Sequence, residues 1–303
     1  MFMPSVKRLD KDPPGVVLLF LLPSFAGFIL FLIIPMLSSA VLSFTNYSGG
    51  FTLKFIGFDN YTRAFTSSTF LNSLKVTVVF VIGAVTLQLF LGLLYALILD
   101  EGLWGRRFFR SLFFMPVVLS SIAISLAFML LLHPSQGPVN AFLKSVNLKP
   151  LGWLADIKTA LPTILLVFVW QNFGYYMVIF ISGLQSISPT LYEAAEIDGC
   201  GAWRKFWSIT FPMLTPVTFF SLIMAVIKSF QVYEQVYIMT GGPEGGGPAG
   251  STSVLVFEIY RSGFTHFQFG YASAQAFILM LIVLCITIIQ YHGQKKWVNY
   301  EIV

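Results

Sequence analysis

The sequence has few charged residues. Only 10% of its 303 residues are Asp, Glu, Lys or Arg, whereas 56% are hydrophobic and the mean hydropathy is +0.80. An average soluble domain is about 25% charged, so a water-soluble fold of this chain could not cover its surface with polar groups. The composition therefore predicts an all-α, polytopic membrane protein, and the length allows about six transmembrane helices with short loops.

Cysteine and histidine are scarce as well. Cys200 and Cys285 lie far apart and form no CxxC pair, which excludes a disulfide framework and a cysteine-rich metal site. The three histidines, His133, His266 and His292, are isolated, so we assign no metal ligand and no catalytic residue. The chain is therefore not expected to be an enzyme in its own right.

Two further absences narrow the function. The net charge of +5 is scattered over loops and forms no basic stripe, so it does not indicate nucleic-acid binding. No glycine-rich loop is followed by Gly-Lys-Ser/Thr, so the chain has no ATP site of that kind, and we expect it to bind no cofactor. The glycine-rich stretch at 241–250 is interpreted as a flexible linker.

Six apolar windows are long enough to cross a membrane. Roughly 20 apolar residues, at a rise of about 1.5 Å each, span a hydrocarbon core about 30 Å thick. The windows are 16–44, 76–99, 111–132, 161–184, 213–232 and 272–291. They predict a transmembrane domain over residues 16–292, preceded by a tail at 1–15 and followed by a tail at 293–303.

The positions of Lys and Arg indicate the orientation of the spans. Ten of these residues lie in the N-terminal tail, the second–third loop, the fourth–fifth loop and the C-terminal tail, and seven lie in the longer loops between. The first set is denser and lies close to the spans. We therefore expect both termini and the fourth–fifth loop, residues 186–211, to be cytoplasmic, in a multi-pass protein of the plasma membrane.

The loop at 186–211 has a local pattern of its own. Ser188 and Pro189 are typical of a helix start, and Gly199 is typical of the residue just after a helix end. Residues 202–209 form a second, shorter amphipathic segment. The pattern predicts a helix, a glycine break and a second helix, followed by a span that opens at Pro212.

This loop could lie on lipid or bind a protein. A lipid-lying helix favours Lys and Arg on its polar face, but the first helix has Glu193, Glu196 and Asp198. Acidic groups are repelled by an anionic inner leaflet. A protein partner is therefore the better account, with Ala194 and Ala195 allowing close approach to the backbone.

The same residues carry a resemblance to a known family. Glu193-Ala194-Ala195, Gly199 and Ile209-Thr-Phe-Pro212 match the pattern E-A-A, three residues, G, nine residues, I-x-L-P, with Phe211 in place of the leucine. This signature is typical of permease subunits of ATP-binding-cassette importers. The stretches RSLFFMPVVLSS, WQNFGYYMVIFISGLQSISP, FQVYEQVYIMTGGP and YASAQA resemble the carbohydrate-uptake group, most closely the first permease of the maltose and glycerol-3-phosphate type. The resemblance extends over nearly the whole chain from Val16.

The resemblance implies a half-channel. Such a subunit pairs with a second, similar permease; two ATPase subunits bind Mg-ATP below the membrane, and an extracytoplasmic solute-binding protein delivers a carbohydrate from above. The loop at 186–211 would contain the coupling helix, which sits in a cleft of the ATPase. Its contact residues would be Glu193, Ala194, Ala195, Asp198 and Gly199.

Polar side chains within the spans are the candidate solute contacts, because such groups are costly in a membrane. By alignment with the motifs of maltose-type permeases, six match positions that line the sugar cavity: Ser121, Gln171, Asn172, Tyr175, Lys228 and Ser229. The alternative is that they bond across helices as packing contacts.

Lys228 stands out among them, because related permeases usually have an uncharged residue there. Its charge suggests a solute with an acidic group, such as a uronic-acid oligosaccharide or a phosphorylated polyol. Two alternatives stay open: the side chain snorkels to the interface, or Glu234 neutralises it locally.

Two other classes of membrane protein were compared with this interpretation. A secondary transporter that works without an ATPase is expected to have inverted repeats and ionisable residues near the midplane. No convincing repeat is seen, and Lys228 is the one charge well inside a span. A membrane-embedded enzyme would need clustered His, Asp or Glu at membrane depth.

Overall fold

The computed structural model describes residues 14–50, 52–100 and 104–299. Within these ranges the chain is helical, and the only β pairing is an isolated bridge between Thr45 and Phe55. The predicted all-α class is therefore confirmed. The predicted tail at 1–15 lies, apart from Pro14 and Gly15, outside the described residues, and so do the last four residues of the predicted tail at 293–303.

Four helices are each long and apolar enough to cross a membrane. The first runs over Leu18–Leu42 through α1 (Pro14–Phe28), a π-helical turn (Ile29–Ile33) and α2 (Ile34–Leu42). The other three are α4 (Ser68–Asp100), α8 (Ile157–Ser186) and α15 (Phe269–Gly293). Two bent helix pairs raise the number of candidate spans in the described chain from four to six, in agreement with the prediction of about six.

The third predicted span is not one continuous helix. Helix α5 (Arg106–Val118) and helix α6 (Ser121–Leu131) meet at an angle of 97°. Leu119 and Ser120 between them have extended backbones, with ψ angles of 149° and 127°. Pro116 supplies no backbone N–H to the last turn of α5, which weakens the helix just before the break. The predicted span over 111–132 therefore corresponds to a bent pair of helices.

The fifth predicted span is bent at its start. The helical segment Ala202–Met213 meets α12 (Thr215–Phe230) at 63°, with Leu214 at the junction. That segment consists of α10 (Ala202–Lys205), a π-helical turn (Phe206–Thr210) and α11 (Phe211–Met213). The remaining short helices are α3 (Asp59–Thr66), α7 (Pro138–Ser145), α9 (Pro189–Ile197), α13 (Glu234–Met239) and α14 (Leu255–Tyr260).

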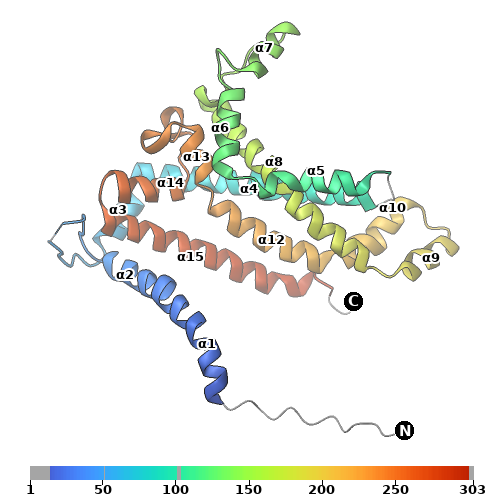
Figure 1. Cartoon of the computed structure of the whole chain (residues 1–303), viewed down its shortest axis with the longest axis horizontal. Coiled ribbons are helices and arrows are strands. Elements are labelled where there is room, and N and C mark those ends of the chain that lie inside the picture. The colour runs from blue at the N-terminus through green and yellow to red at the C-terminus, as the bar shows by residue number, and fades with distance from the viewer. Residues whose placement is uncertain (1–13, 51, 101–103, 300–303) are drawn as a thin grey trace.

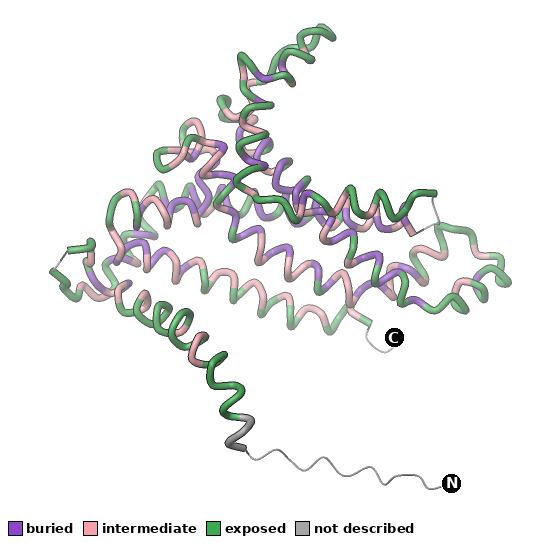
Figure 2. Tube along the Cα trace, in the orientation of Figure 1, coloured by how far each residue is buried: buried purple, intermediate pink, exposed green. Residues whose placement is uncertain are grey.

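The core of the bundle is built on α8, which packs against α4 and α5. Glycines allow these close contacts: a Cβ on Gly92 of α4 would lie 2.9 Å from the Cβ of Tyr176, and a Cβ on Gly174 of α8 would lie 2.0 Å from the carbonyl oxygen of Phe113. Tyr176, Met177 and Phe180 of α8 are fully buried in the resulting core. Figure 2 shows that buried positions gather along the middle of the bundle.

The first helix stands apart from this core. None of its apolar window is buried within the chain, and Leu19, Phe20 and Phe31 are among its exposed side chains. Only its second half, α2, packs closely on another helix, α15. Figures 1 and 2 show the N-terminal half leaning away from the bundle, and most of its described positions are exposed. Such a helix presents its apolar surface to lipid or to another membrane subunit.

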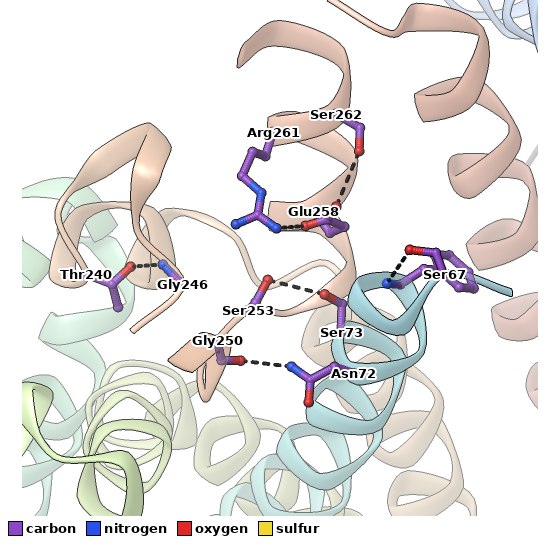
Figure 3. A network of polar contacts seen from close by, with 11 residues as sticks. Ser67, Asn72, Ser73, Thr240, Gly246, Gly250, Ser253, Glu258, Arg261 and Ser262 are labelled. Atoms are coloured by element: carbon purple, nitrogen blue, oxygen red, sulfur yellow. Dashed lines mark hydrogen bonds and ion pairs between the residues drawn. The ribbon is translucent and has the colours of Figure 1, made fainter. Parts of the chain in front are cut away.

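The glycine-rich stretch at 241–250 is bound to the bundle rather than free. Gly246 N donates to Thr240 Oγ1 at 2.8 Å, and Asn72 Nδ2 of α4 donates to the carbonyl oxygen of Gly250 at 3.1 Å. Ser73 and Ser253 share a hydrogen bond at 3.2 Å (Figure 3). These contacts hold the loop against α4, so the interpretation as a flexible linker was wrong.

Candidate functional site

A polar cavity of about 630 Å³ lies where α6, α8, α12 and α13 meet. Three of the six predicted solute-path residues line it: Ser121 at the start of α6, Asn172 on α8 and Lys228 in the last turn of α12. Gln231, Tyr233, Glu234 and Gln235 complete its polar wall, and apolar surface comes from Phe168, Val232 and Val256. The cavity thus combines a few polar groups with apolar walls, as small-molecule sites do.

Lys228 is held at the cavity by an aromatic ring. Its Nζ lies 4.6 Å from the ring centroid of Tyr175, within the range of a cation–π interaction. The two ion pairs found among the described residues do not involve Lys228, although Glu234 lines the same cavity. Direct neutralisation by Glu234 is therefore not seen, and the ammonium group remains available to a ligand.

Gln171 lies behind the cavity wall. Its Nε2 donates to Ser121 Oγ at 3.1 Å and to the carbonyl oxygen of Leu119 at 3.3 Å, and its Oε1 accepts from Gln235 Nε2 at 2.9 Å. The side chain thus joins the break in the third span to α8 and α13. Gln171 fits the packing alternative better than a direct solute contact.

The other two predicted residues are not part of the cavity lining. Tyr175 does not line the cavity but contacts Lys228, which does, and Ser229 is fully buried within the chain. Tyr233, Glu234 and Gln235 line the cavity but were not predicted, because the apolar window ended at residue 232. The polar residues of the FQVYEQVY stretch were the available signal. Because α13 begins at Glu234, Gln235 contacts Gln171 of α8. Hydropathy does not predict this change of chain direction.

The predicted helix of the E-A-A loop is present as α9. It follows Ser188 and begins with Pro189, as expected. Gly199 has a φ of +70°. Its N–H donates to the backbone carbonyl oxygen of Glu196 at 3.0 Å, and the N–H of Cys200 donates to that of Ala195 at 2.8 Å. This pair of hydrogen bonds is the Schellman arrangement that ends a helix at a left-handed glycine. The predicted stop at Gly199 is confirmed.

Helix α9 presents a mixed surface to its surroundings. Glu193, Ala194 and Asp198 are exposed, and Ile197 is 88% exposed although it is apolar. Ala195 is only 7% exposed, because it packs against its own chain. Of the two alanines in the motif, only Ala194 is therefore open to a partner.

Contacts within the loop fix α9 relative to the span that follows. Glu196 accepts a hydrogen bond from Lys205 Nζ at 2.6 Å, and the hydroxyls of Tyr192 and Thr210 lie 3.0 Å apart. The Lys205 ammonium group lowers the pKa of the Glu196 carboxyl below its ordinary value. A lowered pKa means that the ion pair persists at neutral pH and is lost as the pH falls through that lowered pKa.

The loop and the cavity are connected through α12. One end of α12 meets the bent segment Ala202–Met213 that follows α9, and its other end carries Lys228 into the cavity. Figure 1 shows α9 at one end of the bundle, whereas α3 and the start of α15 lie at the opposite end. The segment Ala202–Met213 and α12 therefore form the covalent path from α9 to the cavity.

These features define a helical membrane permease, with a polar cavity within the bundle and an exposed helical loop at one end. Residues 88–298 match the family described as the inner membrane component of binding-protein-dependent transport systems. The chain belongs to this family, and its place in the inner membrane follows from that membership.

Individual relatives agree with this assignment. The chain is 37% identical over 285 residues to the probable ABC transporter permease protein YesP of Bacillus subtilis, covering 93% of this chain and 91% of that protein. It is 32% identical over 254 residues to the sn-glycerol-3-phosphate transport system permease protein UgpA of Agrobacterium fabrum, covering 83% and 84%.

A solved structure shares the fold. The crystal structure of a bacterial alginate ABC transporter, in complex with an alginate pentasaccharide-bound periplasmic protein, contains a chain that superposes with a TM-score of 0.83. Sequence identity is 22%, and the match covers 93% of this chain and 94% of that chain.

Proposed function

We propose that this chain is one of two permease subunits of an ATP-binding-cassette importer for a carbohydrate. The observation that carries the proposal is the loop that contains α9. Its exposed Glu193 belongs to the E-A-A pattern, and the loop continues through the segment Ala202–Met213 into α12, which lines the cavity. Relatives that are named as permeases of lactose, multiple-sugar and sn-glycerol-3-phosphate transport systems support the substrate class.

The proposed assembly has three kinds of partner. A second, similar permease would complete the translocation path, and the exposed first helix of this chain offers apolar surface for such a contact. Two ATPase subunits would bind Mg-ATP and receive α9, which would place the α9 end in the cytoplasm, in accord with the distribution of Lys and Arg. An extracytoplasmic binding protein would deliver the solute to the opposite end.

In the proposed mechanism this chain converts movement of a partner into movement of the cavity. Closure of the ATPase dimer on ATP would displace α9. The Tyr192–Thr210 contact and the Glu196–Lys205 pair would pass the displacement to the segment Ala202–Met213 and then to α12. The cavity would then change the side to which it opens, as a shift between two arrangements of the bundle.

A reconstitution experiment tests the proposed function. Proteoliposomes that contain this chain, its second permease and the ATPase subunits should take up carbohydrate delivered by the binding protein only when ATP is supplied on the α9 side. The control omits the ATPase subunits and should show no uptake above the leak. Uptake that persists without any ATPase would contradict the proposal and favour a secondary transporter.

We also propose that Lys228 recognises an acidic group on the solute. The ammonium group lies at the cavity, is oriented by Tyr175 and has no carboxylate partner among the described residues. A hydrogen bond to a charged group contributes about 1.5–3 kcal/mol, which corresponds to roughly 10- to 100-fold in affinity. Lys228 would therefore discriminate an acidic sugar from a neutral one.

Lys228→Met is expected to lower uptake of a uronic-acid oligosaccharide by about tenfold or more, because the methionine cannot bond the carboxylate. Uptake of a neutral oligosaccharide of the same length should change little. Lys75→Met is the matched control, since Lys75 is exposed on α4 and outside the cavity. An equal loss for both solutes, or no loss for either, would contradict the proposed role.

A further inference from the structure

A second polar cavity lies at the end of the bundle opposite α9. It measures about 220 Å³, is partly open to the surface and is lined by residues 46–48, by α3 and by the start of α15. Figure 1 shows α3 and the start of α15 at the end of the bundle opposite α9. Its polar lining includes Asn46, Asp59, Arg63 and Gln268. None of these residues belongs to the cavity that contains Lys228.

Arg63 is oriented in this pocket but has no anionic partner. Its guanidinium carbon lies 4.1 Å from the ring centroid of Tyr271, whose side chain is buried. Stacking on an aromatic face leaves the N–H groups at the guanidinium edge free to donate. Neither ion pair of the described chain includes Arg63, and Asp59, one turn earlier on α3, does not approach it within ion-pair distance.

The frame around the pocket is fixed by hydrogen bonds. Asn60 Nδ2 donates to the carbonyl oxygens of Ser43 and Thr45, both at 2.8 Å, and Gly270 N donates to the carbonyl oxygen of Tyr47 at 2.9 Å. Gly270 is required for this contact, because a Cβ there would lie 2.1 Å from the carbonyl oxygen of Thr45. The pocket is therefore held in shape before any ligand arrives, which lowers the entropic cost of binding.

The lining defines the chemistry of a ligand. A guanidinium group pairs with a carboxylate through two parallel hydrogen bonds. The carboxylate of Asp59 accepts hydrogen bonds from hydroxyls. The side-chain amide of Gln268, which has no hydrogen bond to another described group, can both donate and accept. The volume is below the roughly 300–1,000 Å³ of sites for drug-sized ligands, so it suits a single small unit.

We propose that this pocket is a second carbohydrate site, which binds one acidic sugar unit with Arg63 on its carboxylate and Asp59 and Gln268 on its hydroxyls. The inference rests on the proposed function, because it places the pocket on the side from which the solute arrives. It gives the permease a contact with an acidic saccharide outside the cavity of Lys228.

The test measures binding to the assembled transporter in lipid nanodiscs, without ATP and without the binding protein. The probes are glucuronate and glucose, and the transporter carries Lys228→Met so that the larger cavity does not contribute. Arg63→Gln should raise the Kd for glucuronate about 10- to 100-fold. Arg63→Lys should give an intermediate Kd, because lysine keeps the positive charge but cannot form the two parallel hydrogen bonds. Lys54→Gln is the control, since Lys54 is exposed nearby but outside the pocket.

Each outcome decides the proposal. Gln268→Ala removes a contact to the sugar hydroxyls but leaves Arg63 and the Tyr271 ring in place. It should therefore weaken binding of glucuronate, and it tests the site even if a substitution of Arg63 disturbs the fold. Unchanged glucuronate binding in the Arg63 and Gln268 variants, or equal binding of glucose, would overturn the proposal. A second assay adds the binding protein: if the variants change only its affinity for the transporter, the proposal is overturned and the pocket is a protein contact. ATP-driven uptake that persists without glucuronate binding would refute this site alone and leave the proposed function standing.

Discussion

Gly174→Ala is expected to prevent the bundle from packing correctly. The added Cβ would lie 2.0 Å from the carbonyl oxygen of Phe113 and 2.8 Å from its carbonyl carbon, and these are backbone atoms of α5 that cannot rotate away. Overpacking of a core typically costs about 1–3 kcal/mol, and a clash between backbones belongs at the upper end or beyond it. The measurement is the thermal midpoint of the purified protein in detergent, followed by size-exclusion chromatography.

Gly27→Ala provides the matched control for this experiment. Gly27 also lies inside an apolar helix, but a Cβ there would meet no atom within 4 Å. Alanine is favoured over glycine in a helix by about 1 kcal/mol, so this variant should be as stable as the parent or slightly more stable. A Gly174→Ala protein with an unchanged midpoint would mean that α5 and α8 do not cross as closely as described.

Glu193→Ala is expected to lower ATP-driven uptake by about tenfold or more, because a polar contact to a charged group contributes about 1.5–3 kcal/mol. Glu193 is exposed on α9, and among the described residues it has no ion-pair partner in its own chain. Its carboxylate is therefore free to contact the proposed ATPase subunit. The measurement is uptake per ATP hydrolysed in proteoliposomes.

Glu196 offers an internal comparison on the same helix. It is acidic and exposed like Glu193, but its carboxylate is already paired with Lys205. Glu196→Ala should reduce uptake less than Glu193→Ala does, because it removes a surface ion pair within the loop and these contribute little. A larger effect at Glu196 than at Glu193 would contradict this assignment and indicate that Glu196 makes the partner contact.

Much of the fold was predictable because a bilayer responds to polarity averaged over some twenty residues. All six apolar windows correspond to helices or bent helix pairs. The break at Leu119 and Ser120 was not predictable in this way, because the residues next to it on both sides are mostly apolar. What makes the break tolerable is the amide of Gln171, which bonds the freed carbonyl oxygen of Leu119 from another helix.

The candidate sites divide in a similar way. The stop of α9 at Gly199 is local, so sequence spacing was sufficient to predict it. The position of Lys228 over Tyr175 depends on how α12 and α8 are rotated against each other, which no local pattern records. The burial of Ala195 depends likewise on tertiary packing, and only the structure separates it from its exposed neighbour Ala194.

The isolation of the first helix has a consequence for biosynthesis. The most apolar window within Leu18–Leu42 has a mean hydropathy of 2.5, and none of that window is buried by the rest of the chain. It can therefore partition into the bilayer as soon as it emerges during translation, before any later helix exists for it to pack on. This segment needs only lipid around it, whereas the helices that come after it in the chain bury part of their surface against one another.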